Sequence, residues 1–466
     1  MAAIYPFVLT LLLQWLAGFG VMATLRSTLP RSIVAPIALL LGAFLETLVV
    51  IAVDRIGVGL SFTTVSLGMG LVVVAAHARW SIVRSWYAAF LSSPSVSFRM
   101  YDIVAFVIAA YLVFAGMWAA YYWPVTPFDA MAGIDLMARQ SVVDGTLNNS
   151  VLTDPALSGR LSNQPFYAPF AMLQQVIYRL MGWPFGQLWL PVLTFAFFWV
   201  MWALLRRHAH PFIANVLFLL LVMVPELHAY TYLLQTDFLN AVYVSIGVII
   251  LGLDVERRDM SNLVLAALFM AAGCWSRTET IAVVGLGMLV SFPLLRNAVG
   301  TQKALTSVGV LLAASATTFA IWHIGYFYGV FPVRPESGAE IVGFSLSKFV
   351  DVVAATFTVV IADMGLWGWT MPLFVLVLIV SVLRNKSVGD PWLLVWTVAI
   401  LLALEIVGTL FASAVVGQTI RRGMFKLIPL MYLFMARSPF VSSLSATLQV
   451  WETGHSRNAA SKQRKG

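Results

Sequence analysis

The sequence predicts an all-α protein that crosses a membrane many times and carries one long polar loop on the outer side. Apolar residues make up 61% of the 466-residue chain and charged residues only 10%, against about 25% charged in soluble domains. Runs of roughly 17 to 25 apolar residues, enough to span a bilayer as a helix, recur along almost the whole chain. Lysine and arginine gather in alternate connections between these runs, which is the pattern of cytoplasmic loops.

The first part of the chain is predicted to cross the membrane four times. The first run lacks a basic leader and a small-residue cleavage site, so we expect it to be retained as a span. Arginines lie between the third and fourth runs, which puts that connection in the cytoplasm and the amino terminus outside. These four expected spans are Tyr5–Leu25, Ile33–Val53, Val58–Ala76 and Asp102–Tyr122.

Nine further spans are expected after the polar loop, for a total of about 13. Two shorter apolar stretches do not count as spans: Phe166–Met181 is predicted to lie on the outer surface in the interface, and Val350–Ile361 to be interfacial or re-entrant. The nine are Phe185–Leu205, Phe212–Ala229, Phe238–Leu253, Leu263–Trp275, Ile281–Leu295, Leu305–His323, Trp367–Leu383, Trp392–Phe411 and Met424–Ala436.

The expected organisation has three parts. A lone cysteine, Cys274, excludes an internal disulfide, and its apolar surroundings predict a buried side chain. The net charge of +8 comes from residues spread over connections and tail, so nucleic acid is not an expected partner. The parts are 1–101 (three spans and a basic cytoplasmic loop), 102–437 (a membrane region with outer loops 123–184 and 324–365) and 438–466 (a basic cytoplasmic tail).

The polar loop 123–169 is the most informative stretch of the chain. It carries Asp129, Asp135 and Asp144 and ends in Asn163-Gln164-Pro165-Phe166-Tyr167. A loop of this size is uncommon as a mere connector. Asp129 lies a few residues beyond the predicted membrane exit, where a carboxylate can act on a substrate held in the lipid. This placement favours an enzyme.

Polar groups from other segments are predicted to face the same outer side. Acids and bases from many helices on one face would form a site for a charged, lipid-linked substrate. Arginines there need an explanation, because the positive-inside rule disfavours them outside. Beyond the loop acids, the groups are Glu226, His228, Asp237, Arg277, Glu279, Arg334, Glu336, Glu340, Lys348, Arg421, Arg422 and Lys426.

The carboxylates also have purely structural interpretations. Asp135 and Arg139 are four residues apart and would pair on a helix. Asp129 would cap a helix that begins at Ala130, a role compatible with catalysis, and Asp237 would cap the helix that follows it. Both interpretations stay open beside a role in the site.

The basic groups have structural interpretations as well. Arg277 and Glu279 would pair with each other across a turn. The adjacent Arg421 and Arg422 would bind lipid head groups without specificity.

Two acids, Glu46 and Glu405, lie inside predicted spans. Intramembrane carboxylates commonly take part in proton or ion coupling, so they support an alternative function as a transporter or flippase. Against it, the two halves of the chain show no matching pair of helices broken by glycine or proline.

The outer-face residues resemble the GT-C superfamily of membrane glycosyltransferases. The likeness is to its polyprenyl-phosphate-sugar-dependent branch, with the aminoarabinose transferases and protein O-mannosyltransferases, and it covers roughly 102–437. Two departures are the single acid of Asp129-Ala130, where the family has a pair, and Gln164-Pro165, where close relatives have Pro-Pro or Lys-Pro. The matching motifs are Phe128-Asp129, Ala138-Arg139, Asp144-Gly145, Gln164-Pro165-Phe166-Tyr167, Thr236-Asp237-Phe238, Ser276-Arg277-Thr278-Glu279, and Arg421 or Arg422 before Pro429.

The resemblance implies a GT-C-like bundle in the inner (plasma) membrane, with its site facing the periplasm or exterior. It implies sugar transfer from a polyprenyl-phosphate donor to a glycolipid, glycan or protein. The resemblance establishes no cofactor, and a divalent metal held by Asp129, Asp237 and His228 is left open. A non-catalytic assembly partner is a third possibility, because Ala130 replaces the second acid. The implied roles are catalytic for Asp129 and Asp237, donor-phosphate binding for Arg277, Arg421 and Arg422, and substrate binding for Asp135, Gln164, Tyr167 and Glu279.

Overall fold

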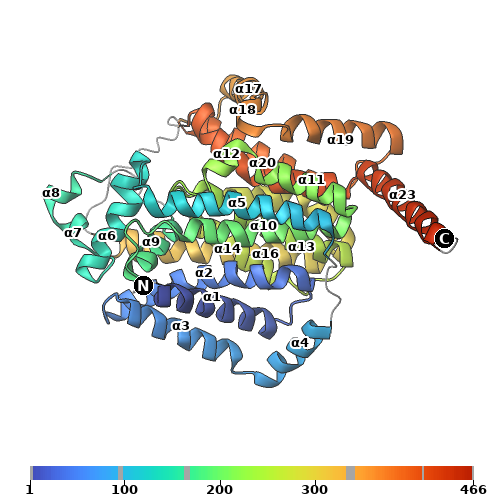
Figure 1. Cartoon of the computed structure of the whole chain (residues 1–466). Helices are drawn as coiled ribbons and strands as arrows, with labels where there is room; N and C mark the ends of the chain where they lie inside the picture. Colours follow the sequence, from blue (N-terminus) through green and yellow to red (C-terminus); the bar gives the residue numbers. More distant parts are fainter. Residues whose placement is uncertain (1–3, 93–97, 162–167, 332–341, 412–413, 464–466) are drawn as a thin grey trace.

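A computed structural model describes residues 4–92, 98–161, 168–331, 342–411 and 414–463, and within these ranges the secondary structure is helical, with no strand. Eight helices are long and apolar enough to cross a membrane, so the protein is an all-α polytopic membrane protein (Figure 1). They are α1 (Ile4–Thr24), α2 (Arg31–Ile56), α5 (Met100–Tyr122), α10 (Trp189–His208), α13 (Asp237–Arg257), α15 (Thr280–Val299), α16 (Thr301–Trp322) continued by the π-helical turn η3 (His323–Tyr328), and α20 (Pro391–Leu410).

Two bent pairs raise the number of candidate spans to ten. In the first, α3 (Phe62–His77) meets α4 (Trp80–Ser92) at 82°. In the second, the helical stretch Val416–Arg437 meets α23 (Pro439–Gln463) at 52°. That stretch consists of η5 (Val416–Ile420), α21 (Arg421–Gly423), η6 (Met424–Lys426) and α22 (Leu427–Arg437).

The remaining apolar helices are α11 (Pro211–Val222), α14 (Leu263–Ser276) and α19 (Thr370–Asn385). The 13 expected spans overlap these three, the two bent pairs and the eight long helices, but by length and composition only eight to ten of them are candidate spans. The expected run Phe212–Ala229 is interrupted, because α11 ends at Val222 and the separate α12 (Pro225–Ala229) follows. Pro225 has no backbone N–H with which to continue α11.

One prediction about the polar loop is wrong. The amphipathic helix α9 (Phe170–Leu180) is too short to span, as expected, but it does not lie on the surface: every residue from Phe170 to Tyr178 is buried. It packs against α6 (Asp135–Asp144), α2 and α10. The other short loop helices are η1 (Ala130–Ile134), α7 (Ser150–Thr153) and α8 (Pro155–Ser158).

The stretch that was expected to be interfacial or re-entrant is also helical. It begins as α17 (Leu346–Ala355), continues as the π-helical η4 (Thr356–Ile361) and is followed by α18 (Met364–Trp367). α17 packs against α20, and η4 against η5. One side of this stretch stays exposed and apolar, at Val350, Phe357 and Val359 among others.

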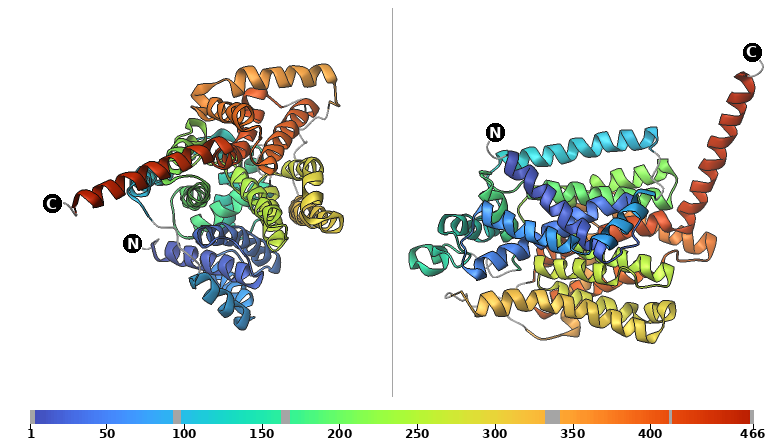
Figure 2. Two further views of the ribbon diagram at one scale, coloured as in Figure 1. Left: turned by 90° about the vertical axis from the view of Figure 1, so that its right-hand side faces the viewer. Right: turned by 90° about the horizontal axis from the view of Figure 1, so that it is seen from below.

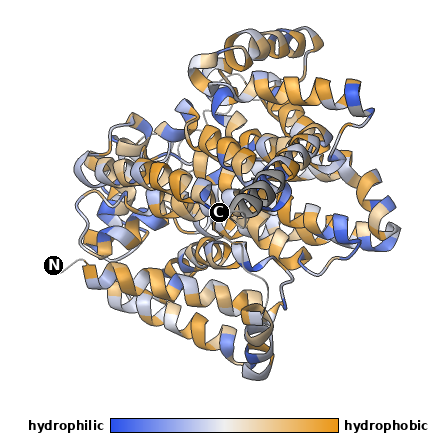
Figure 3. Cartoon of the chain, turned by 45° about the vertical axis from the view of Figure 1, so that its right-hand side comes forward, coloured by the Kyte–Doolittle hydropathy of each residue, from blue (hydrophilic) through white to orange (hydrophobic). Residues whose placement is uncertain are grey.

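The bundle has two different ends. At one, α13 begins with Asp237, which pairs with Arg277 after α14. At the other, Glu256 near the end of α13 pairs with Arg437 at 3.0 Å. We call these the Asp237 end and the Arg437 end. The loop helices α6 to α9 lie beyond the Asp237 end, and α23 projects from the Arg437 end (Figures 1 and 2). Apolar residues dominate the helices between the two ends (Figure 3).

Helices α1 and α2 pack with their backbones almost in contact. A Cβ added to Gly18 would lie 1.9 Å from the Ala38 carbonyl oxygen, and one added to Gly42 would lie 1.8 Å from the Gln14 carbonyl oxygen. Small residues permit this approach between membrane helices. It brings the Gln14 side chain within 2.6 Å of Glu46, so the buried acid of α2 is hydrogen-bonded across the helix pair.

Candidate functional site

The turn between α14 and α15 places an arginine between two carboxylates. Arg277 leaves the helical conformation at the end of α14, and Glu279 directly precedes α15. The guanidinium of Arg277 pairs with Asp237, the first residue of α13, and with Glu279. Asn240 holds the turn in place, because its amide donates to Gly273 O and Thr280 Oγ1, both at 2.7 Å. The expected Arg277–Glu279 pair is therefore present, with Asp237 as an additional partner.

A second pair of arginines, from a distant part of the sequence, reaches Asp237 and a further carboxylate. Arg422 Nη1 lies 3.6 Å from Asp237 Oδ2, and Arg421 Nε lies 3.1 Å from Glu226 on α12. The short α21 carries both arginines close to α20, where a Cβ on Gly423 would lie 2.3 Å from Leu404 Cδ2. Glycine at this position therefore permits the approach.

We call Glu226, Asp237, Arg277, Glu279, Arg421 and Arg422 the Asp237 cluster. It unites five of the nine predicted site residues and adds Glu226. The Asp237 side chain is only 2% exposed, whereas those of Arg277, Arg422 and Arg421 are 17%, 21% and 31% exposed. The acid is therefore the buried centre of the cluster, and the guanidinium groups around it remain accessible to a ligand.

Asp237 was expected either to cap α13 or to belong to the site. Its side chain makes no capping hydrogen bond; it is the first helical residue, after Thr236 at the cap position. Its carboxylate instead faces Arg277 and Arg422. A carboxylate in the first turn is also favoured by the positive end of the helix dipole.

Two further residues border the cluster. Tyr230, after α12, contacts Phe425 edge to face with ring centroids 4.8 Å apart. Burial, and then the charge of Asp237, raise the pKa of the Tyr230 hydroxyl. Lys426 is 1% exposed and lies in electrostatic range of Glu279, Arg277 and Asp237. Sequence reasoning placed Lys426 on the outer face but gave it no role. The sequence feature that points to a role for Lys426 is its position as a lone lysine inside an apolar run.

Asp135 does not pair with Arg139, as its spacing suggested. Its carboxylate accepts hydrogen bonds from Arg179 Nη2 at 2.7 and 2.8 Å and from Gln175 Nε2 at 2.8 Å. Arg139 is exposed instead. The partner comes from α9 because α6 packs directly along it. This contact fixes the loop helices to each other, and it is separate from the Asp237 cluster.

Asp129 lies at the Asp237 end but does not cap the helix at Ala130. Its own backbone is already helical (φ −60°, ψ −37°), and its side chain makes no capping hydrogen bond. The side chain is half-buried. The loop that carries Asp129 follows α5. This helix starts at the Arg437 end and finishes at the other end, where Trp123 contacts Tyr232 with ring centroids 5.7 Å apart. Gln164 and Tyr167, also predicted for the site, lie outside the described residues.

His228 is half-buried on α12, beyond the end of α11. Burial lowers the pKa of its imidazole, and its Nδ1 is enclosed without a hydrogen-bond partner. The described residues contain no group of three or more histidine, cysteine, aspartate or glutamate side chains placed to hold a metal ion. The arrangement of His228, Asp129 and Asp237 therefore gives no metal centre in this part of the chain.

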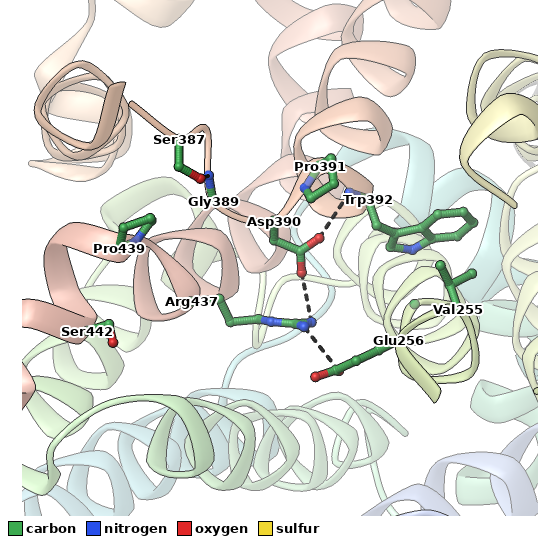
Figure 4. A pocket seen from close by; sticks show the side chains of 11 residues that line it. Val255, Glu256, Ser387, Gly389, Asp390, Pro391, Trp392, Arg437, Pro439 and Ser442 are labelled. Carbon is green, nitrogen blue, oxygen red and sulfur yellow. Dashed lines mark hydrogen bonds and ion pairs between the residues drawn. The ribbon is translucent and has the colours of Figure 1, made fainter. Parts of the chain in front are cut away.

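A cavity of about 520 Å³ opens at the opposite end of the bundle (Figure 4). It lies between the end of α13, the α19–α20 connection and the α22–α23 junction. Arg437 crosses it, with ion pairs to Asp390 at 2.8 Å and Glu256 at 3.0 Å. None of the predicted site residues lines it. The cavity is thus distinct from the Asp237 cluster.

Comparisons of this chain with family models, curated proteins and solved structures gave no match. The site is therefore interpreted from its own geometry. Partly exposed guanidinium groups lie around a buried carboxylate at one end of a membrane bundle. The neighbouring loop carries further acids.

Proposed function

We propose that the protein is an integral-membrane glycosyltransferase. It would move a sugar from a polyprenyl-phosphate donor to a glycolipid, glycan or protein acceptor at the Asp237 end. The observation that carries the proposal is the pairing of Arg277 and Arg422 with the buried Asp237, beside Arg421, which pairs with Glu226. Arginine binds phosphate through charge-assisted, bidentate hydrogen bonds, and these three remain accessible where a lipid-anchored phosphate arrives.

The distribution of basic residues supports an orientation for the protein. Arg206, Arg257 and Arg437 lie at the Arg437 end, together with the connections that the positive-inside rule assigns to the cytoplasm. The Asp237 end then faces the periplasm or exterior of the inner membrane, as in the GT-C family that the motifs resemble. The three shorter apolar helices would complete a bundle of 13 spans.

The chemistry requires a base and a stabilised leaving group. The acceptor hydroxyl oxygen bonds to the anomeric carbon of the sugar, the bond from that carbon to the phosphate oxygen breaks, and the proton passes to a carboxylate. Asp129 is the proposed base, since it belongs to the accessible loop, with Asp237 as the second catalytic carboxylate, paired with Arg277 and Arg422. The arginines would stabilise the charge that grows on the departing polyprenyl phosphate. General-base assistance typically contributes about 10² to 10⁴ in rate.

The transport alternative depends on Glu46 and Glu405. Both are almost fully buried, and they lie at different helix interfaces: Glu46 accepts from Gln14 on α1, and Glu405 accepts from Thr356 on η4 at 3.2 Å. Neither has a basic partner in the described part of the chain. A coupling path would need the two to act together, and their separate surroundings favour the transferase.

The test is sugar transfer in membranes with matched expression of wild type and Asp129→Asn. Labelled polyprenyl-phosphate sugars are offered to endogenous acceptors, and Asp154→Asn, which changes an exposed acid of the same loop, is the control. We expect Asp129→Asn to lose about 10² or more of the transfer rate and Asp154→Asn to retain it. Absence of wild-type transfer over a broad donor panel would overturn the proposal in favour of transport or a non-catalytic partner.

A further inference from the structure

Lys426 differs from the other basic residues at the Asp237 end. Its side chain is 1% exposed, and the described residues offer its ammonium neither a hydrogen bond nor an ion pair within 4.0 Å. Arg277, Arg421 and Arg422 each have a carboxylate partner. A buried charge is costly unless it is paired, and among the described residues the Lys426 ammonium has no direct partner, although the charges of Glu279 and Asp237 act on it.

The fold holds Lys426 in place through its neighbours. It ends the 3₁₀ turn η6, which packs on α13 between α21 and α22. The preceding Phe425 contacts the rings of Tyr230 at 4.8 Å and Trp367 at 6.0 Å. These contacts fix the backbone. The charges that act on the Lys426 ammonium are those of Glu279, Arg277 and Asp237. Lys426 therefore belongs to the interior side of the Asp237 cluster.

Another lysine at this end shows what a structural role looks like. Lys348 donates its ammonium hydrogens to Thr409 O at 2.8 Å and Phe411 O at 3.3 Å, where they satisfy the end of α20. Lysine near a helix carboxyl end is a common stabilising arrangement. In the part of the chain that the structure describes, the Lys426 ammonium has no such acceptors, although Lys426 is the more buried of the two.

We propose that Lys426 binds the phosphate group of the lipid-linked substrate directly and forms the inner wall of that site. This inference rests on the proposed function and extends it to a residue that the family motifs do not include. With Lys426, four basic side chains face three acidic ones, Glu226, Asp237 and Glu279. A phosphate anion would offset the remaining positive charge and supply the missing acceptor for the ammonium.

The experiment measures binding of polyprenyl monophosphate, with neutral polyprenol as the reference, to the full-length protein in detergent. The variant is Lys426→Met, which keeps the length of the side chain and removes its charge. Lys303→Gln, an exposed lysine at the Arg437 end, is the matched control. We expect Lys426→Met to raise the Kd for polyprenyl phosphate about 10-fold or more. Lys303→Gln and all polyprenol affinities should stay unchanged.

A second measurement on the same samples tests whether the ammonium lacks a protein partner. Without ligand, Lys426→Met should unfold at the same temperature as wild type or higher, because it removes a buried charge that has no hydrogen bond or ion pair to the described residues. With polyprenyl phosphate, wild type should gain more thermal stability than the variant.

The outcomes separate the two proposals. If wild type does not bind polyprenyl phosphate in preference to polyprenol, the proposed function fails. If wild type binds it and Lys426→Met binds equally well, only the role of Lys426 is overturned. If Lys426→Met is much less stable without ligand, the lysine has a structural role, and the inference is likewise rejected.

Discussion

Removal of the buried acid of the Asp237 cluster should strengthen lipid-phosphate binding while it impairs transfer. Asp237→Asn keeps the size of the side chain and abolishes its negative charge. Arg277 retains Glu279 as a partner, and Arg422 Nε retains its hydrogen bond to Gln418 O at 3.2 Å. The arginines therefore stay in place, and the site becomes more positive by one unit.

The size of the effect follows from the geometry. Arg422 Nη1 lies 3.6 Å from the Asp237 carboxylate. A phosphate on the far side of that guanidinium would lie roughly 6 Å from the carboxylate, where two unit charges repel by about 3 kcal/mol at an effective dielectric constant of about 20. Solvent at the partly exposed arginines reduces this repulsion to about 1 kcal/mol, which corresponds to about fivefold tighter binding.

The assay titrates polyprenyl phosphate against wild type, Asp237→Asn and Asp351→Asn, where Asp351 is an exposed acid of α17. We expect Asp237→Asn to lower the Kd about fivefold and to reduce sugar transfer, and Asp351→Asn to change neither. Weaker binding by Asp237→Asn would refute the reasoning, since it would show that the acid organises the arginines more than it competes with the phosphate.

Two predictions concern stability. Asp102 is fully buried and accepts hydrogen bonds from Arg206 Nε at 2.6 Å and Asn215 Nδ2 at 2.7 Å, so Asp102→Asn should cost about 3 kcal/mol or more of unfolding free energy. The control Glu452→Gln, at a more exposed ion pair, should cost less than about 1 kcal/mol. Equal unfolding midpoints of the two variants in denaturant titrations would contradict this prediction. Because burial lowers the folded-state pKa of His228, the unfolded chain binds the proton more readily, so this histidine reduces stability as the pH falls through the ordinary histidine range. In thermal unfolding between about pH 7 and 5, His228→Asn should lose less stability than wild type as the pH falls. An unchanged dependence of the unfolding temperature on pH would show that His228 does not cause this loss.

The helices were predictable because their cause is local. A run of apolar residues long enough for the bilayer must satisfy its own backbone hydrogen bonds, which a helix does, so most expected spans overlap a single helix. The break after Val222 was not foreseen, although Pro225 marks it. The burial of α9 was also missed, because an amphipathic pattern does not say whether the apolar face meets lipid or protein.

The site was predictable as a set of residues on one face but not as a set of contacts. Arg277 and Glu279 pair within one turn, so their spacing sufficed. Asp135 appeared to have a partner four residues away, and the structure gives it Arg179 from a neighbouring helix. Local spacing favours an i, i+4 pair only weakly, whereas the guanidinium of Arg179 reaches both carboxylate oxygens.

The sequence by itself determined the class of the protein, the position of most of its helices and the set of polar residues that gather at one end, because hydrophobic length and charge asymmetry act on each segment separately. Only the tertiary structure decided that Asp237, Arg277 and Arg422 form one cluster, and that Lys426 lies buried beside it without a direct partner among the described residues. These contacts depend on how α13, α14 and α21 pack, and packing between distant segments is a property of the whole bundle that no single stretch of the sequence carries.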